Sequence, residues 1–281
     1  MSTRVVSIQA HDHQLVATVF GAEEPKAILV IASATGVLQG FYAKFAQYMQ
    51  HSGVTTITFD YQGIGKSRDR KMSAFSNNAA DWSRQDLASV VGYAIEHNPG
   101  VPIALMGHSI GGQMISLTKQ PDQVKRIIFV AAQSGYWKHW SGKGRRQMWF
   151  NFKVLIPGLS NLFGYLPSKN VTGMENLPKR MAKQWTRWCN SPDYFLSEFP
   201  REETNFDHFK GQVSAYSIEN DRFAPPAAVE WLYANYSKAE VKYRHLVPAE
   251  FGVKDIGHFK IFKDQFQNSI WELLRSDVLD E

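Results

Sequence analysis

The sequence predicts an α/β protein in which a mostly parallel sheet of about eight strands carries helices on both faces. Short apolar, β-branched runs alternate with segments of helical periodicity up to residue 132, and the alternation resumes at residue 212. Strands that alternate with helices in this way form parallel βαβ units. The chain has 281 residues, of which 44% are hydrophobic and 20% charged, so one large domain with an insertion is expected.

The expected strands differ in how deeply they are buried. Two β-branched runs, 4–9 and 15–20, flank a polar turn and indicate a hairpin. Residues 27–32 form a continuous apolar run, which is typical of a strand covered on both faces. The remaining expected strands are 54–60, 101–106, 126–132, 212–218 and 241–247, and the expected helices are 41–51, 78–97, 113–119, 227–237 and 259–279.

The regular alternation stops between residues 134 and 201, where no strand pattern is evident. This stretch holds five of the eight tryptophans, and its prolines predict several short helices. Between residues 135 and 203 eleven Lys/Arg outnumber five Asp/Glu, which gives +6 against +5 for the whole chain. We expect residues 134–205 to form a helical lid over the carboxyl edge of the sheet, and residues 1–133 and 206–281 to form the core.

A short motif follows the expected strand 101–106: Gly107-His108-Ser109-Ile110-Gly111. The pattern G-x-S-x-G between a strand and a helix is that of a nucleophile elbow, whose tight turn presents the serine hydroxyl at the top of the sheet. The elbow glycines, Gly107 and Gly111, let the strand and the helix approach closely. Ser109 is the expected nucleophile, and the amide of Ile110 is placed to stabilise an oxyanion.

A serine nucleophile needs a base that takes its proton, and the base needs an acid that orients it. In an elbow fold these partners follow the serine in the order acid, then histidine, on loops at the carboxyl edge of the sheet. His258 fits the base, because it follows the last expected strand. His208 precedes the acid loop, and His245 falls within a strand, where we expect it to be packed.

The loop after the expected strand 212–218 holds two carboxylates that could orient the histidine, Glu219 and Asp221. We prefer Asp221, because residues 223–225 can fix the exit of the turn. Glu219 stays as the alternative. Asp255, although near the expected base in the chain, is interpreted as an ordinary loop residue.

A second oxyanion donor is expected from the loop that follows strand 27–32. The loop reads Ser33-Ala34-Thr35-Gly36-Val37. Its candidate donor is a backbone amide near Gly36 or Val37, and we assign Val37. The hydroxyl of Thr35 could add a contact.

These residues resemble the α/β-hydrolase superfamily, in its serine esterase, lipase and peptidase branch. Besides the elbow, the resemblance rests on Asp60-Tyr61-Gln62-Gly63-Ile64-Gly65-Lys66-Ser67, which is similar to the family's D-x-x-G-x-G-x-S turn. Residues 221–225 are similar to its acid loop, and Gly257-His258 to its histidine motif. The resemblance covers nearly the whole chain and implies a Ser-Asp-His hydrolase.

The resemblance also bears on details of the site. It favours Asp221 over Glu219 as the acid, and the expected lid lies where the family inserts its caps. The serine nucleophile argues against the epoxide-hydrolase and haloalkane-dehalogenase branches, which use aspartate. One departure concerns the oxyanion loop, because many members have His-Gly before the oxyanion residue, whereas this loop reads Ala34-Thr35-Gly36-Val37.

The expected function is hydrolysis of a small-molecule carboxylic ester through an acyl-enzyme. An amidase or peptidase, or an acyltransferase, would use the same site. A further alternative is a non-catalytic binding or scaffold protein, although an intact Ser, Asp and His set in the required order argues against it. No cofactor and no metal are expected, because His11 and His13 lie in a polar turn without a Cys or carboxylate cluster to complete a metal site.

The remaining observations concern location and partners. The one cysteine, Cys189, cannot pair within the chain, so a reducing compartment is the simpler interpretation. No apolar stretch approaches about 18 residues and no apolar signal core is evident, so a cytoplasmic protein without stable membrane insertion is expected. No nucleic-acid-binding module is recognised, and a homodimer stays open. The basic excess of the lid could attract anionic substrates or an anionic membrane surface.

Overall fold

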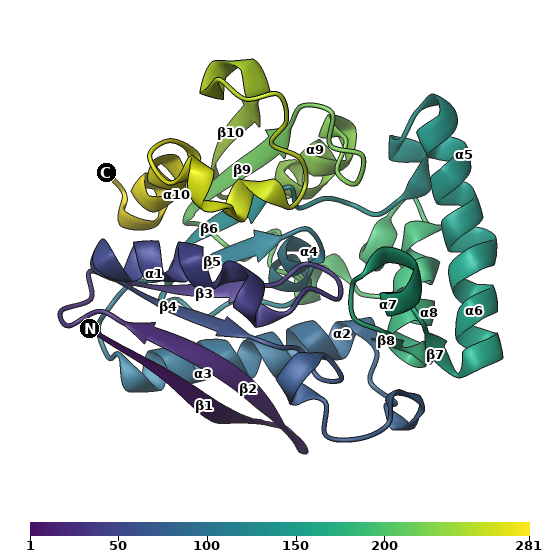
Figure 1. The fold of residues 1–281 in the computed structure, drawn as a ribbon, viewed down its shortest axis with the longest axis horizontal. Helices are drawn as coiled ribbons and strands as arrows, with labels where there is room; N and C mark the ends of the chain where they lie inside the picture. Colours follow the sequence, from purple (N-terminus) through teal and green to yellow (C-terminus); the bar gives the residue numbers. More distant parts are fainter.

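The computed structural model describes residues 1–281, apart from the side chain of Val171. The strands of its central sheet are β1 (Ser2–Ala10), β2 (His13–Gly21), β3 (Ala27–Ala32), β4 (Val54–Phe59), β5 (Ile103–His108), β6 (Val124–Val130), β9 (Gln212–Ile218) and β10 (Glu240–Leu246). They lie in the order β1-β2-β4-β3-β5-β6-β9-β10 (Figure 1). The pairings β1–β2 and β2–β4 are antiparallel, and the other pairings of this sheet are parallel.

Helices cover both faces of the sheet. α1 (Ala43–His51) and α10 (Ile270–Leu279) pack on one face, and α3 (Ala88–His97) and α4 (Ile110–Leu117) pack on the other. α9 (Pro226–Ala234) lies along β9 (Figure 1). The predicted fold class, a mostly parallel sheet of eight strands between two helical layers, is therefore confirmed.

Strand burial follows the position of each strand in the sheet. β3 and β4 lie in the middle and are buried along their whole length, as the apolar run of β3 predicts. β10 forms an edge, and its residues 240–245 are exposed. The expectation that His245 is packed is therefore wrong, because the edge position of β10 leaves this side chain in solvent. Its Nδ1 lies 2.6 Å from Oγ of Ser217.

The end of the chain differs from the single helix expected over 259–279. Residues 260–262 and 264–266 form two 3₁₀ turns, and α10 begins only at Ile270. The side chains of Phe262, Phe266 and Ile270 are all buried, at the four-residue spacing that is typical of a helix. The indole N–H of Trp271 donates to the carbonyl oxygen of Ile261 at 2.8 Å, which ties the first turn back onto α10.

The segment 134–205 lies beyond the carboxyl ends of the strands, at the right of Figure 1. Its helices are α5 (Gly142–Phe150), α6 (Ile156–Phe163), α7 (Lys169–Thr172) and α8 (Lys179–Cys189), and a π-helical turn at Asn151–Leu155 joins α5 to α6. The segment also holds a small antiparallel sheet of β7 (Tyr165–Leu166) and β8 (Leu177–Pro178), which the sequence pattern did not predict because each strand has two residues. Within the described part of the chain, no helix is long and apolar enough to span a bilayer.

Candidate active site

Ser109 lies between the end of β5 and the start of α4, with φ at 55° and ψ at −121°. A serine adopts such a backbone conformation only where its surroundings impose it. The two elbow glycines show how close these surroundings are, because neither position has room for a side chain. A Cβ on Gly107 would lie 2.4 Å from Cα of Gly112, and a Cβ on Gly111 would lie 2.0 Å from the carbonyl oxygen of Ala32. Strand, turn and helix thus interlock as a nucleophile elbow requires.

The structure brings Asp221 and His258 together from two different loops. Nδ1 of His258 lies 2.7 Å from Oδ2 of Asp221, and both side chains are buried. Oδ1 of Asp221 accepts the backbone N–H groups of Phe223 at 2.8 Å and of Ala224 at 3.2 Å. Because a carboxylate only accepts hydrogen bonds, Nδ1 of His258 carries the proton, and its Nε2 keeps a free lone pair.

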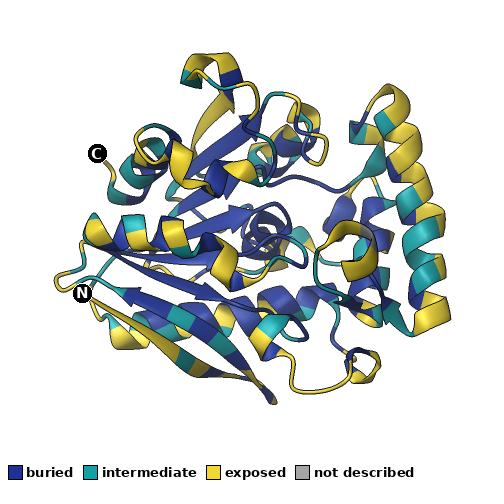
Figure 2. Cartoon of the chain, in the orientation of Figure 1, coloured by how far each residue is buried: buried dark blue, intermediate teal, exposed yellow. Residues whose placement is uncertain are grey.

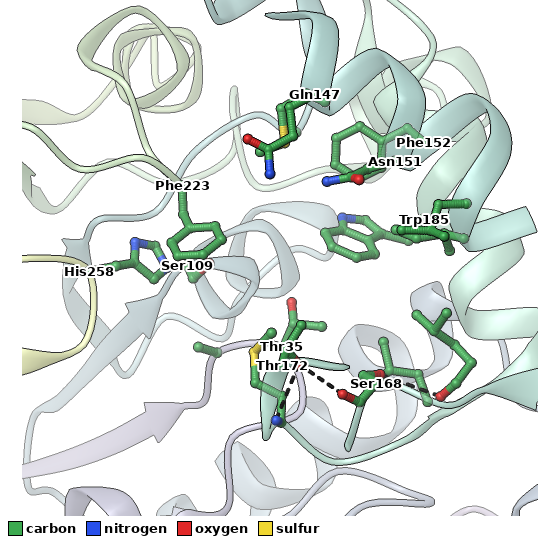
Figure 3. A pocket seen from close by; sticks show the side chains of 18 of the residues that line it. Thr35, Ser109, Gln147, Asn151, Phe152, Ser168, Thr172, Trp185, Phe223 and His258 are labelled. Carbon is green, nitrogen blue, oxygen red and sulfur yellow. Dashed lines mark hydrogen bonds between the residues drawn. The ribbon is translucent and has the colours of Figure 1, made fainter. Parts of the chain in front are cut away.

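Ser109 and His258 line the same cavity, and Figure 3 shows the imidazole beside the serine. Among the described residues, Oγ of Ser109 forms no hydrogen bond with His258; such contacts often tighten only when substrate is bound. Oγ lies instead 3.5 Å from Nε2 of Gln133, which also donates to the carbonyl oxygen of Phe223 at 3.1 Å. Gln133 follows β6, and no sequence motif marked it.

The other candidates from the sequence lie elsewhere. Glu219 is half-buried, and its backbone N–H pairs with the end of β10. Asp255 is exposed and forms an ion pair with Lys260 at 2.6 Å. His208 is exposed and lies beside Gly211, at the amino end of β9, whereas the elbow follows the carboxyl end of β5. The carboxylate that contacts the expected base is therefore that of Asp221.

Two backbone amides bear on an oxyanion site. Ile110 is the first residue of α4, so its N–H has no acceptor within the helix. The N–H of Val37 donates to the carbonyl oxygen of Ala34 at 3.1 Å and is committed to a turn. Ala34 and Thr35 of this loop both line the cavity next to Ser109, and the N–H of Ala34 donates to Oη of Tyr42 at 3.0 Å. We therefore move the expected second donor from Val37 to the amide of Thr35.

A buried chain of hydrogen bonds joins the three loops of the site. The N–H of Ala34 donates to Oη of Tyr42 at 3.0 Å, and Oη of Tyr42 lies 2.8 Å from Nδ1 of His108. Nε2 of His108 lies 2.9 Å from the carbonyl oxygen of His258 and must donate to it. Burial holds the pKa of His108 well below its usual value. His108 is therefore neutral, and Tyr42 donates to its Nδ1.

The glycine-rich turn after β4 supports the loop that carries Thr35. The carboxylate of Asp60 accepts the backbone N–H of Gln39 at 2.8 Å and that of Lys66 at 3.0 Å. A Cβ on Gly65 would lie 2.4 Å from Oδ2 of Asp60, so the turn requires glycine there. This motif ties the segment that follows β3 to the end of β4 and does not reach the cavity.

The cavity has a volume of about 430 Å³, and much of its wall comes from the segment 134–205. The apolar side chains from this segment include Trp140, Met148, Phe152, Leu159, Leu166 and Trp185. Gln147 and Asn151 bring two amides to the wall, across from Thr35 (Figure 3). The same segment contacts the loop after β3, where the N–H of Glu175 donates to the carbonyl oxygen of Gly36 at 2.8 Å.

The two histidines near the first turn take different positions. His11 is exposed, whereas His13 begins β2 and is buried, with Nε2 2.7 Å from Oδ1 of Asp86. The expectation of a polar turn thus holds for His11 and is wrong for His13, because Asp86 supplies a buried partner. In the described residues, no three His, Cys, Asp or Glu side chains gather as metal ligands would.

Comparison with known proteins gives partial relatives and a similar fold. A monoglyceride lipase homolog from Monkeypox virus is 31% identical over 87 residues, which are 31% of this chain and 30% of that protein. Monoacylglycerol lipase from Mycolicibacterium smegmatis is 27% identical over 94 residues, which are 33% of this chain and 32% of that protein. The chain thus spans about a third of the length of these curated relatives.

Similarity to solved structures extends over the whole chain. The α/β hydrolase GrgF from Penicillium sp. sh18 matches with a TM-score of 0.64 over 100% of both chains, at 17% identity. At this identity the likeness shows the fold. A family match goes further, because residues 23–184, more than half of the chain, match the family described as serine aminopeptidase, S33. The chain belongs to this family of α/β hydrolases.

Proposed function

We propose that the protein is a serine hydrolase that cleaves carboxylic esters of small molecules through an acyl-enzyme. One observation carries the proposal: His258, held by Asp221 at 2.7 Å, lines the same apolar cavity as the strained Ser109. An imidazole that is oriented by a carboxylate, next to a serine on a nucleophile elbow, is the arrangement that activates a hydroxyl at neutral pH.

In the first half of the reaction, Oγ of Ser109 attacks the carbonyl carbon of the ester while Nε2 of His258 takes the hydroxyl proton. Asp221 holds the imidazole in the required tautomer and stabilises its positive charge. The carbonyl oxygen becomes an oxyanion, which the amides of Ile110 and Thr35 stabilise. When this intermediate collapses, the alcohol leaves with the proton from His258, and the acyl group stays on Ser109.

Water completes the reaction. His258 takes a proton from the water that attacks the acyl carbon, and Ser109 recovers its proton as the carboxylic acid leaves. Ester and water thus give acid and alcohol. An amine as leaving group, or an alcohol as acceptor in place of water, would use the same steps, so amide or peptide hydrolysis and acyl transfer stay as alternatives.

The substrate that best fits the cavity is an ester with an apolar acyl or alcohol part. Side chains such as Phe152, Leu159 and Trp185 offer such a group a wall without charge. The names of the two partial relatives, a monoglyceride lipase homolog and a monoacylglycerol lipase, agree with an apolar ester. Because most of this wall belongs to residues 134–205, we propose that this segment is a lid that helps to select the substrate.

The test is labelling with a fluorophosphonate, read by intact mass, on the wild type and on Ser109→Ala. Ser168→Ala is the matched control, because Ser168 lines the same cavity but lies far from the elbow in the chain. We expect one adduct on the wild type and on Ser168→Ala, and none on Ser109→Ala. Hydrolysis of an ester panel should fall by about 10³-fold or more in Ser109→Ala. A folded wild type without an adduct would favour the scaffold alternative.

A further inference from the structure

One long helical rod forms the outer border of the segment 134–205. α5, the π-helical turn and α6 follow each other without a break from Gly142 to Phe163 (Figure 1). At 1.5 Å per residue the rod is about 33 Å long. Its inward side chains, among them Met148, Phe152 and Leu159, line the cavity.

The outward side of the rod is also apolar. Trp149, Phe150, Val154, Leu162 and Phe163 are between 44% and 76% exposed. Figure 2 shows this exposed side along the border of the molecule, away from the sheet. A helix of a globular protein usually presents polar residues on its solvent side. Large apolar groups concentrated there indicate an interaction surface.

The charge of the rod has a single sign. Residues 142–163 contain four basic residues, Lys143, Arg145, Arg146 and Lys153, and no Asp or Glu. Arg146, Phe150 and Val154 follow each other at four-residue intervals, so basic and apolar side chains share one side of the helix. We call this side, with Lys153 and Leu162, the outer lid face.

We propose that the outer lid face docks on the surface of an anionic lipid bilayer. A helix with Trp, Phe and Leu beside Lys and Arg lies in the interface, where its apolar groups enter the headgroup region and its cations contact anionic lipids. A symmetric dimer through the same face would place two sets of four cations against each other, which disfavours a second copy of this chain as the occupant. The bilayer satisfies both the apolar and the cationic groups.

Docking in this way would have a consequence for the cavity. The cavity lies directly behind the rod, and a helix with its side chains is about 10–12 Å wide. The docked protein would therefore hold its cavity about one helix width from the lipid. Binding itself goes beyond the proposed hydrolysis and is measured without turnover, so the two proposals can fail separately.

The experiment is vesicle flotation of the full chain at low salt, with phosphatidylglycerol–phosphatidylcholine vesicles and with pure phosphatidylcholine vesicles. We expect binding to the anionic vesicles to be at least about tenfold stronger, and to weaken at 1 M salt, where the screening length is about 3 Å. Phe150→Ser combined with Leu162→Ser should weaken binding to anionic vesicles by about tenfold or more. Arg146→Gln combined with Lys153→Gln should do the same.

Matched controls separate the outer lid face from the general positive charge of the protein. Val5→Ser with Val241→Ser removes exposed apolar groups elsewhere, and Lys119→Gln with Lys254→Gln removes exposed cations elsewhere. Each control pair should bind anionic vesicles within about twofold of the wild type, and thermal unfolding shows whether each variant is folded.

Three outcomes would overturn the proposal. The first is a wild type that does not float with anionic vesicles. The second is an equal loss of binding in the lid variants and in their controls. That result would show that binding depends on the general charge and apolar surface of the protein and not on the outer lid face. The third is a concentration-dependent dimer that Phe150→Ser with Leu162→Ser abolishes, which would assign the outer lid face to a second copy.

Discussion

Nε2 of His108 lies 2.9 Å from the carbonyl oxygen of His258, so the residue just before the proposed nucleophile holds the backbone of the proposed base. Their rings are 5.0 Å apart. Through Tyr42 the same imidazole reaches the backbone of Ala34, next to the proposed oxyanion donor. One buried chain of hydrogen bonds thus couples the elbow, the base loop and the loop after β3.

Removing the hydroxyl of Tyr42 should disturb all three loops at once. Tyr42→Phe leaves the N–H of Ala34 and Nδ1 of His108 without their buried partner, which should lower the free energy of unfolding by about 1–3 kcal/mol. We expect kcat to fall on the order of tenfold with little change in KM, because the groups that act in the transition state shift. Steady-state kinetics and denaturant unfolding test this. Tyr48→Phe, on the following helix, is the control, and equal kcat values for the two variants would contradict the coupling.

The choice of acid can be tested by two conservative substitutions in one loop. Asp221→Asn keeps the shape of the side chain but removes the carboxylate that accepts from Nδ1 of His258, so the wrong tautomer is favoured. We expect kcat to fall by on the order of 10³-fold or more, whereas Glu219→Gln should stay within about threefold of the wild type. Steady-state kinetics on one ester measures both, and the reverse order would assign the acid to Glu219.

Gly36 lies where the segment 134–205 meets the loop after β3. Its φ is +64°, and a Cβ there would lie 2.9 Å from the carbonyl oxygen of Glu175. Gly36→Ala should therefore displace the loop that carries Thr35, with a loss of kcat of about tenfold or more. A cost of about 1–2 kcal/mol in the free energy of unfolding is also expected.

Two other glycines serve as controls that separate the effect of backbone strain from the effect of the contact with Glu175. Gly100 has a φ of +81° with open space around it, so Gly100→Ala should lower stability but leave kcat unchanged. Gly40 has open space and no positive φ, so Gly40→Ala should change neither quantity by much. A Gly36→Ala variant with the kcat of the Gly100→Ala variant would show that the contact between Gly36 and the segment 134–205 has no part in turnover.

The stability of the protein should depend on pH through His13. Burial lowers the pKa of His13, but the hydrogen bond to Asp86 and the charge of Asp86, with a smaller effect of Asp12, raise it overall above 6.5. A histidine whose pKa is higher in the folded than in the unfolded state contributes stability that is complete below the unfolded value. This contribution is lost as the pH rises through the folded value.

We therefore expect Tm to fall, as the pH rises above the ordinary histidine pKa of about 6.5, more steeply in the wild type than in His13→Gln. Glutamine can still donate to Asp86 but does not titrate in this range. Differential scanning calorimetry at several pH values measures the slope, and His11→Gln, at an exposed position, is the control. Parallel slopes for the wild type and His13→Gln would rule out His13 as the source.

The sheet could be predicted from the sequence because burial on both faces leaves a continuous apolar run. β3 begins and ends at the predicted residues for this reason, and β9 also matches its predicted range. The contact between Asp221 and His258 also follows from chain order, because the loops after neighbouring parallel strands meet at one edge. Their catalytic roles stay predictions until the variants are measured.

Other features depended on contacts that a sequence pattern does not contain. Phe262, Phe266 and Ile270 have helical spacing, yet α10 begins only at the last of them. His13 meets a carboxylate 73 positions away in the chain. The N–H of Val37 closes a turn onto Ala34, which argues against it as the second oxyanion donor, and only the backbone geometry reveals this turn.

The exposure of β10 has a consequence for the protein at high concentration. An edge strand offers unpaired N–H and C=O groups, and a second molecule could add a strand there and start an ordered aggregate. Glu240, Lys242 and Arg244 alternate along this strand, all of them exposed. An incoming strand would have to remove water from these charges, so the exposed edge is a poor template for fibril growth.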